Sequence, residues 1–591
     1  MRNAFIVRKT YLSFVITAIL TSLTATVGML IDNIIVGQSL GSEALGAMGI
    51  VGPISLIFSA CGNICSSGGG AKAAQALGRG QKDRFCQIFT VNMLFVMVSG
   101  LLFTVLGMTF APQIALFLGA KEVLLEPATQ YLYGYFLGTV PTIAVSAMMS
   151  FIRMDGSPKL PLVCIAVMSV TNIILDLMMV YVFHLGMFGM ALATTISYCL
   201  ALATACLHFL KKNTTLRLVR PVSLLNELGS TIYTGFPSAI NRISDTVKVT
   251  LLNHMLAAFV SVSAITALSV RTQAQNFLGA VILGISQAIT PTIGMFFGEE
   301  DRTAMRDTLK VTLRFGFSVV VVLAAILFAV PFLFCRLLGV RDAGILNMSG
   351  MALRFFSLSL PLYLMNTVLM NFYQCTKRVG LSSMICILQS LVYTVVFAFL
   401  LIRPLGASGV WLAFLLGEVM TLLTTVLVIS WKNKRLVTSL DDIMMLDKEF
   451  GGSDQDRIEL SIGNSMDEVM TISTGIYQFG DEHGIDTKTL HTLSLCIEEM
   501  AGNVVQHAFL PGEKRWLDVT LINKPETIIF RLRDNGAAFD PLAYLSQGNY
   551  DTYGIRMIHA LATSFEYRRS MGLNNLIIHL KKESECATHG V

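Results

Sequence analysis

The segment LPLVCIAVMSVTNIILDLMMVYVFH, residues 160–184, decides how this chain folds. It is apolar for longer than the roughly 20 residues that a helix needs to cross a bilayer. An amide, Asn172, and a carboxylate, Asp176, interrupt it. A carboxylate at the middle of a bilayer costs at least about 2.5–3.5 kcal/mol on insertion scales. The segment therefore predicts a membrane helix whose polar side chains have a partner or a purpose.

The composition of the whole chain agrees with a membrane protein. Of its 591 residues 54% are hydrophobic and only 14% are charged, whereas a soluble globular protein has about 25% charged residues. The net charge of +5 is modest and unevenly placed, which indicates membrane topology and excludes nucleic-acid binding. The eleven cysteines are scattered without a CxxC pair, so neither a disulfide framework nor a zinc site is expected.

Apolar segments like the first one recur from residue 11 to residue 430. Each can cross a bilayer as a helix, and none has the alternating pattern of a barrel strand. The run from Tyr11 to Ile31 has the length of a full span, so we expect an uncleaved first helix and not a signal peptide. The twelve predicted spans are residues 11–36, 45–67, 87–110, 130–152, 160–184, 187–209, 230–256, 262–297, 311–335, 350–374, 381–402 and 408–430.

The loops between these spans differ in charge. The loops after odd-numbered helices, such as GQSLGSEA, HLGMFG and VSVSA, are nearly free of Lys and Arg. By the positive-inside rule we expect a multi-pass protein of the cell (inner) membrane with both termini in the cytoplasm. Basic loops follow every even-numbered helix: GRGQKDR, RMDGSPK, LKKNTTLRLVR, EEDRTAMRDTLK, TKRVG and WKNKR.

The membrane part repeats itself at a shift of 220 residues. Pro141 falls on Pro361, Gly119 on Gly339, and LGMFGMALA at residue 185 on LGASGVWLA at residue 405. We therefore expect two six-helix halves, residues 1–215 and 216–430. Duplicated halves are typical of transporters that rock about a central cavity; a duplicated scaffold without transport is the alternative.

Polar side chains inside the first half could form a cation site. Asp32 lies late in the first span, Asn172 and Asp176 are four residues apart and share a helix face, and Thr194 adds a hydroxyl on the next helix. Such oxygen ligands can hold Na⁺ or exchange protons, unless each group merely reaches the membrane surface from a helix end. In the second half, Asp245, Arg242 and Lys248 could pair with one another, and Glu418 is an isolated carboxylate.

Residues 1–430 resemble the multidrug and toxic compound extrusion (MATE) family. The resemblance implies export of small organic, often cationic, compounds across the lipid bilayer in exchange for H⁺ or Na⁺. It implies a cation site at Asp32, Asn172, Asp176 and Thr194, with Asp245 as the counterpart of an acidic residue that some members use; the second half reads SLVYTVV where a copy of the Asn–Asp pair would fall. The segments that carry it are IDNIIVGQSLGSEALGAMGI, RMDGSPKLPLVCIAVMSVTNIILD, GMFGMALATTIS, ALSVRTQ and GISQAITPTIGMFFGEEDR.

After Trp431 the chain becomes polar. A linker, residues 431–454, precedes residues 455–591, where strand-like runs such as WLDVTLI, TIIFRLRD and NLIIHLKK alternate with helical ones. In IEEMAGNVVQHA, residues 497–508, Glu499 and Asn503 lie on one helix face. RDNGAAFDP and the helix-start glycine of YDTYGIRMIHALA follow. This order predicts a nucleotide site without a Walker lysine.

The order also resembles the GHKL (Bergerat) ATP-binding fold, in the branch of the anti-sigma-factor serine kinases. The resemblance covers residues 455–583 and implies ATP and Mg²⁺ as cofactors. It departs at Ala538, where a second glycine is usual, and at Asn574 or Asn575, which replace a threonine. The implied roles are Mg²⁺ ligation by Asn503, activation of a hydroxyl by Glu499 as catalytic residue, adenine contact by Asp534 with close approach at Gly536, phosphate contact by Gly554, and a nucleotide contact by Asn575.

The expected fold is thus an all-α polytopic membrane protein of twelve helices in two six-helix repeats, joined to a C-terminal α/β sandwich of GHKL type. We expect a secondary antiporter whose ATP-binding tail regulates it, with a cytosolic (anti-anti-sigma-like) protein as a further partner. The alternative is a membrane receptor whose tail is a serine kinase or a partner-binding module. The sequence leaves open whether the tail is an enzyme.

Overall fold

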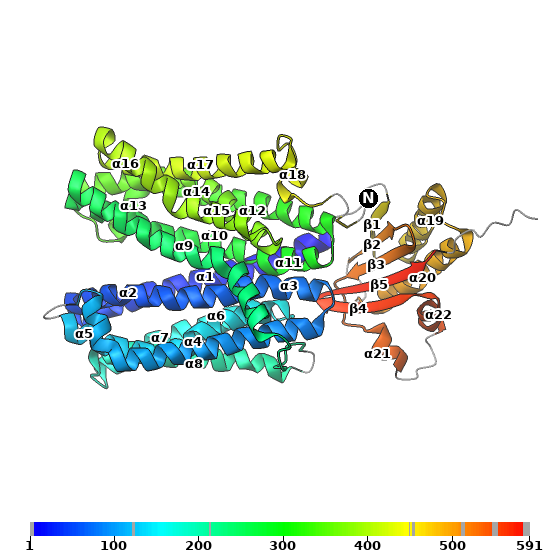
Figure 1. Ribbon diagram of the computed structural model, residues 1–591, viewed down its shortest axis with the longest axis horizontal. Coiled ribbons are helices and arrows are strands. Elements are labelled where there is room, and N and C mark those ends of the chain that lie inside the picture. The colour runs from blue at the N-terminus through cyan, green and yellow to red at the C-terminus, as the bar shows by residue number, and fades with distance from the viewer. Residues whose placement is uncertain are drawn as a thin grey trace, which may run out of the picture. The chain divides into compact units, whose positions relative to one another are not determined.

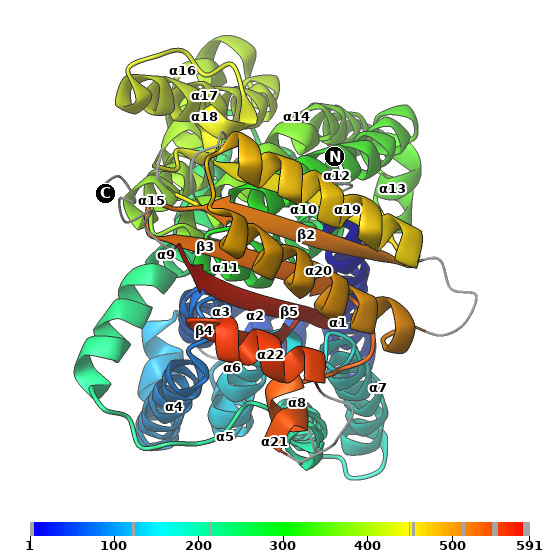
Figure 2. The same ribbon diagram turned by 90° about the vertical axis from the view of Figure 1, so that its right-hand side faces the viewer.

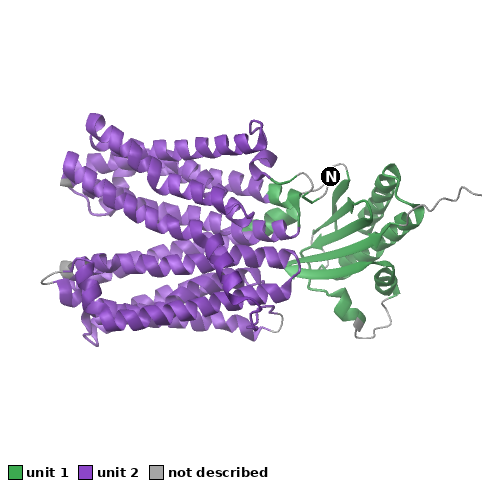
Figure 3. Cartoon of the chain, in the orientation of Figure 1, with its two compact units in different colours: residues 1–12, 300–307, 446–591 green, residues 13–299, 308–445 purple. Residues whose placement is uncertain are grey.

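The computed structural model describes residues 5–120, 124–211, 214–447, 450–451, 456–509, 515–546 and 553–582. The chain forms two compact units (Figure 3). Residues 13–299 and 308–445 make the larger one; residues 1–12, 300–307 and 446–591 make the smaller one.

The larger unit is helical, as apolar segments must be when lipid offers no partner for their backbone groups. Figure 1 labels most of its helices. The bounds of its first half are α1 Phe5–Ser39, α2 Gly41–Asn63, η1 Ile64–Gly69, α3 Gly70–Gly78, α4 Lys82–Phe117, α5 Leu125–Leu137, α6 Thr139–Met154, α7 Leu160–Tyr181, α8 Gly186–Cys206 and η3 Leu207–Leu210. Those of the second half are α9 Leu224–Phe259, α10 Val262–Gln287, α11 Ile289–Gly298, α12 Arg302–Ala329, α13 Pro331–Leu337, α14 Ala343–Cys375, α15 Val379–Ile387, η4 Leu388–Val392, α16 Tyr393–Leu405, α17 Ala407–Asn433 and α18 Leu440–Met444.

Among the described residues, ten helical stretches are long and apolar enough to cross a membrane. The pair α5 and α6, bent by 50° at Gly138, makes an eleventh if it is one span. The twelfth predicted span is α9, which is too polar for the same criterion; its middle holds Arg242, Asp245 and Lys248. α9 packs against α2, η1 and α15, so it belongs to the bundle although it is more polar than the other spans. The polytopic all-α architecture is confirmed.

The internal repeat is visible in the helix bounds. A shift of 220 residues carries Lys82 and Phe117, the ends of α4, onto Arg302 and Leu337, the start of α12 and the end of α13. The same shift carries Gly78, the end of α3, onto Gly298, the end of α11. The two halves therefore share one succession of spans.

The two halves touch at the end that carries the basic loops. A Cβ atom at Gly78 would overlap the Met295 carbonyl, and one at Gly298 would overlap the Gln75 carbonyl. The Gln75 side-chain amide donates to the Cys375 carbonyl at 2.6 Å. Glycine allows this close approach of α3 to α11, which holds the two halves in contact at the basic-loop end.

The smaller unit contains one antiparallel sheet of five strands in the order β1-β2-β3-β5-β4. Figure 2 shows α19, α20 and α22 across one of its faces. Every second residue of the strands, such as Leu517, Val519 and Leu521 of β2, points into the core below these helices. The predicted α/β sandwich is confirmed. Its elements are β1 Arg457–Gly463, α19 Met466–Glu482, α20 Thr487–His507, β2 Trp516–Asn523, β3 Thr527–Asp534, α21 Pro541–Ser546, α22 Tyr553–Leu561, β4 Ser564–Ser570 and β5 Leu573–Lys581.

The other face of the sheet is rich in arginine. Within the smaller unit, Arg457, Arg531 and Arg533 converge on the carboxylate of Asp301, at N–O distances of 3.1, 3.4 and 3.0 Å. Asp301 is 1% exposed, so these charge-assisted bonds replace its lost hydration. Arg533 Nε also donates to Asn575 Oδ1 at 2.7 Å, which places the Asn575 side chain on this face.

The close approach of the two halves predicts a stability difference between two glycine variants. Gly298→Ala should cost about 1–3 kcal/mol, because its methyl group meets backbone. Gly229→Ala is the control, since no atom lies within 4 Å of its added Cβ and alanine is the better helix former. Thermal unfolding of the purified protein should show a lower Tm for Gly298→Ala alone; equal Tm values would contradict the contact.

Candidate functional site

The first half brings two membrane carboxyl groups together. A Cβ atom at Gly28 of α1 would lie only 2.9 Å from Ser169 Oγ of α7, so the two helices nearly touch there. Asp32 follows Gly28 by about one helix turn. Its carboxyl group lies within hydrogen-bonding reach of the Asp176 carboxyl group of α7.

The closeness of these carboxyl groups favours a bound proton or cation. Asp176 is 0% exposed, and its Oδ2 accepts from Asn172 Nδ2 at 2.5 Å. Its Oδ1 is buried and has no hydrogen-bond partner among the described residues. Two carboxyl groups can bond to one another only when one of them carries a proton, and a metal cation between them is the alternative. The pair is therefore suited to take up and release a small cation.

Thr194 of the predicted cation site lies on α8. Its hydroxyl donates to the Met190 carbonyl at 3.2 Å. No hydrogen bond to either carboxyl group is found in the described part of the chain, so the structure joins three of the four predicted residues.

Aromatic side chains that the sequence reasoning missed stand next to the pair. Tyr131 of α5 is close enough to Asp32 and Asp176 to interact with both electrostatically. Its ring stacks on Tyr135 with 5.8 Å between centroids, and Tyr135 stacks on Phe58 at 5.3 Å. The spacing of Tyr131 and Tyr135, four residues apart in YLYGY, was the sequence signal that could have revealed them. Such rings bind organic cations on their faces.

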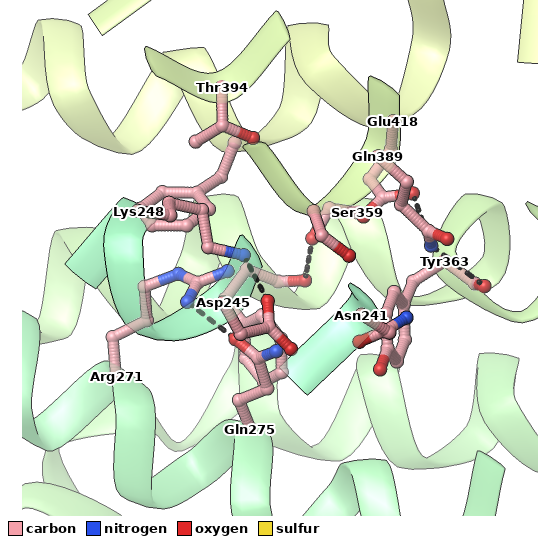
Figure 4. A pocket seen from close by; sticks show the side chains of 13 residues that line it. Asn241, Asp245, Lys248, Arg271, Gln275, Ser359, Tyr363, Gln389, Thr394 and Glu418 are labelled. Carbon is pink, nitrogen blue, oxygen red and sulfur yellow. Dashed lines mark hydrogen bonds and ion pairs between the residues drawn. The ribbon is translucent and has the colours of Figure 1, made fainter. Parts of the chain in front are cut away.

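The second half holds a buried charge cluster (Figure 4). Lys248 Nζ lies 2.7 Å from Asp245 Oδ1, so Asp245 pairs with a lysine, one of the arrangements that the sequence left open. The Arg271 guanidinium lies 3.4 Å from the centroid of the Phe414 ring, and its Nη1 donates to Gln275 at 2.8 Å. The cavity among these side chains measures about 20 Å³, which is room for one water or small ion and not for an organic compound.

Glu418 has neutral donors in the same cluster. Its Oε2 accepts from Asn366 Nδ2 at 2.8 Å and from Gln389 Nε2 at 3.0 Å. Gln389 lies in η4, a π-helical turn, and such turns often mark functional sites. No ion pair of Glu418 is found among the described residues, so its geometry resembles that of Asp176 more than that of Asp245.

In the smaller unit, α20 presents Glu499 and Asn503 on one face. A Cβ atom at Gly554 would overlap Glu499 Oε2, so the start of α22 lies directly against this carboxylate. The Asn503 side chain is half-buried one turn along α20. The structure thus brings together Glu499 and Gly554, and a phosphate group at the start of α22 would lie near both.

Asp534 lies at the end of β3 in a buried hydrogen-bond network. Its Oδ1 accepts from the Gly536 backbone N–H at 2.7 Å and from Asn574 Nδ2 at 2.8 Å. Burial raises the pKa of Asp534, while these donors and the charge of Arg569 counteract the increase. A fixed carboxylate of this kind can accept a hydrogen bond from an exocyclic amino group.

The partner of Asp534 is Asn574 and not Asn575. In the pairing of β3 with β5, Asp534 lies opposite Asn574 and Arg533 lies opposite Asn575. Residues opposite one another share a face, so Asn574 faces the helix-covered side and Asn575 faces the arginines. Asn574 Oδ1 also accepts from Tyr567 and Arg569, each at 2.7 Å.

The donor set suits a nucleotide with Mg²⁺. In the described part of the chain no group of three His, Cys, Asp or Glu side chains could hold a metal alone. Mg²⁺ typically takes one or two protein ligands and completes its shell with phosphates and water. Asn503 and Glu499 can supply the protein ligands. Residues 547–552, before Gly554, lie outside the described residues.

Comparisons with protein families identify both parts of the chain. The MatE family model matches residues 17–178 and 237–400, more than half of the chain. The model of the histidine kinase-like ATPase domain matches residues 464–580. Both resemblances seen in the sequence are confirmed.

Relatives and solved structures cover the membrane part. Multidrug export protein MepA of Staphylococcus saprophyticus is 25% identical over 444 residues, 74% of this chain and 96% of that protein. MepA of Staphylococcus aureus is 24% identical over 445 residues, with the same coverage. An outward-facing multidrug resistance MATE transporter of the MOP superfamily has a TM-score of 0.68 at 20% identity, over 72% of this chain and 95% of its own. A MOP superfamily transporter from Pyrococcus furiosus has the same values.

The contact between Gly554 and Glu499 predicts the effect of one methyl group. Gly554→Ala should displace the Glu499 carboxylate and weaken ATP binding about tenfold or more. Gly475→Ala in α19 of the same unit is the control, because its Cβ meets no atom within 4 Å. Titration of the full-length protein with a fluorescent ATP analogue measures both; equal affinities would show that this contact does not shape the nucleotide site.

Proposed function

Because the chain belongs to the MATE family of transporters, we propose that its membrane unit is a secondary antiporter. It exports small organic, often cationic, compounds in exchange for H⁺ or Na⁺. The observation that supports this proposal best is the closeness of two carboxyl groups, Asp32 and Asp176, inside an apolar bundle, where the buried Asp176 favours a bound proton or cation. Asn172 fixes Asp176 in place for that exchange.

The coupling follows from charge and burial. With a proton or Na⁺ bound, the pair is closer to neutral and tolerates its apolar surroundings; without it, the net negative charge attracts a cationic compound. The coupling ion and the substrate therefore compete. Each shifts the equilibrium between the two states of the transporter only by its differential affinity for them. An ion that moves down its concentration gradient can therefore drive a compound outward against the gradient of that compound.

The aromatic cluster beside the pair supports an organic substrate. Tyr131 lies near both carboxyl groups, and its ring stacks on Tyr135, which stacks on Phe58; recognition of lipophilic cations needs aromatic surfaces and one fixed charge. The MepA relatives are named as multidrug exporters, which agrees with such a site.

The closed contact at the basic-loop end supports an alternating cycle. With Gly78 and Gly298 packed against the opposite half, the two halves are in contact at this end. We assign the basic-loop end and both termini to the cytoplasm, as the charges of the loops indicate. Export then requires this contact to open for loading.

We propose that the ATPase-like domain binds ATP with Mg²⁺ and regulates the transporter. Asn503 and Glu499 would hold the Mg²⁺, Asp534 with Asn574 would hold the adenine, and the start of α22 at Gly554 would hold phosphate; the metal would supply positive charge that offsets the phosphate charge. Its compact unit includes residues 300–307, the connection between α11 and α12 together with the start of α12, and Asp301 in this segment is held by three arginines. Nucleotide binding can therefore bias that connection, and a cytosolic protein could read the same state.

A second function is favoured by the position of Glu499. A carboxylate next to a phosphate-binding helix start is where a base for a serine hydroxyl is needed. The tail would then phosphorylate a cytosolic protein, and the membrane part would act as its receptor.

Neutralising the carboxyl pair tests the antiport. Asp32→Asn and Asp176→Asn should each lower efflux of ethidium from cells at least about tenfold, because the exchanged charge is lost. Asp83→Asn is the control, since Asp83 is exposed in the first turn of α4. Absent efflux in the wild type, or unchanged efflux in both variants at equal expression, would favour the receptor.

Removing the Mg²⁺ ligand separates regulation from energy supply. Asn503→Ala should abolish Mg-ATP binding while efflux persists with altered rate, because the ion gradient supplies the energy. Gln506→Ala, an exposed position on the same helix, should change neither. Loss of efflux to the level of Asp32→Asn would instead make the nucleotide an obligatory part of transport.

A further inference from the structure

A second cavity, of about 280 Å³, lies between the two halves at the basic-loop end. Lys72 of α3, Arg79 and Arg84 line it from the first half, and Lys377, in the turn between α14 and α15, lines it from the second. No carboxylate lines it among the described residues. Four cations from separate segments therefore face one space.

Only part of this charge is compensated. Glu227 of α9 pairs with Lys72 at 2.5 Å and with Arg84 at 3.4 Å. No ion pair or hydrogen bond of the Arg79 and Lys377 side chains is found in the described part of the chain. Burial lowers the pKa of Lys377, and the charges of Arg79 and Arg84 lower it further, as expected for cations held near one another.

We propose that this cavity binds a phosphate-bearing anion that links the two halves. Guanidinium and ammonium groups are the groups with which proteins hold phosphate. The cavity is several times the roughly 30 Å³ that one water occupies, so a phosphate group fits with its substituent. Tyr233 and Gln81 line the same space with further polar groups.

Two sources carry the required chemistry. One is the headgroup of an anionic phospholipid, which basic residues beside membrane helices attract. The other is a soluble phosphate compound. Both would contact Arg79 of the first half and Lys377 of the second, and both would relieve the repulsion between these cations.

Binding would favour the state in which the halves touch. Gln75 of the first half already donates to the Cys375 carbonyl, two residues before Lys377. When the halves part at this end, the cations of the cavity separate and the anion loses half of its partners. The anion thus shifts the equilibrium toward the closed basic-loop end by its differential affinity. This inference does not depend on the coupling ion or on the ATPase-like domain.

The test uses full-length protein in detergent and two double variants. Arg79→Gln with Lys377→Gln removes the two unpaired cations, which are exposed enough to leave folding intact. Lys82→Gln with Lys159→Gln removes the same charge from two exposed positions in basic loops of the first half that do not line the cavity. The probes are phosphatidylglycerol, phosphatidylcholine as the neutral-headgroup control, and inorganic pyrophosphate.

We expect phosphatidylglycerol, pyrophosphate or both to raise the Tm of the wild type and the control variant. The apparent affinity should fall about tenfold in the cavity variant. A response to the lipid alone identifies the headgroup as the source, and a response to pyrophosphate alone identifies a soluble compound. No response to either, or equal affinities in both variants, overturns the site.

A second measurement tests the link between the halves. Cys375 is fully buried where they meet, so its alkylation by N-ethylmaleimide, followed by mass spectrometry, reports their separation. The anion should slow this reaction severalfold in the wild type and the control variant but not in the cavity variant. An unchanged rate in the wild type would overturn the link.

Discussion

The proposed exchange depends on two carboxyl groups that lie close together among apolar helices. Asp32 of α1 and Asp176 of α7 come together because Gly28 lets the helices approach at Ser169. Repulsion between two such charges favours a bound proton or cation. In the proposed function, the duplicated halves and the contact at the basic-loop end provide the alternating access that the exchange needs.

Much of this was predictable because bilayer thickness and hydropathy constrain a membrane helix strongly. The spans, the two halves and the carboxyl pair followed from residue type and spacing. The bend at Gly138 and the tyrosines near the pair did not, because they depend on packing between helices. The pairing of Asp245 with Lys248 depends on side-chain rotamers, which the sequence does not reveal. The sequence therefore could not show that Glu418, which has neutral donors, differs from Asp245, which has a lysine partner. In the tail, Asn574 and Asn575 differ only by strand register, where one residue changes the face.

The candidate site in the tail is built differently from the one in the membrane unit. Its site is a set of fixed donors and acceptors at the end of a sheet, with Asp534 locked by Asn574 and Glu499 against Gly554. Its compact unit includes residues 300–307, which connect α11 to α12 within the second half and begin α12. In the proposed function, nucleotide and phosphate-bearing anion act on the balance between states, and an ion gradient supplies the free energy.

In the proposed antiport, compound and coupling ion displace one another. Calorimetric binding of tetraphenylphosphonium to the purified protein, in buffers of different ionisation enthalpy with and without Na⁺, counts the ions released. Linkage predicts that each bound compound releases about one proton or Na⁺ from the wild type and none from Asp32→Asn. Release of the same number from both proteins, or of none from the wild type, would contradict the exchange.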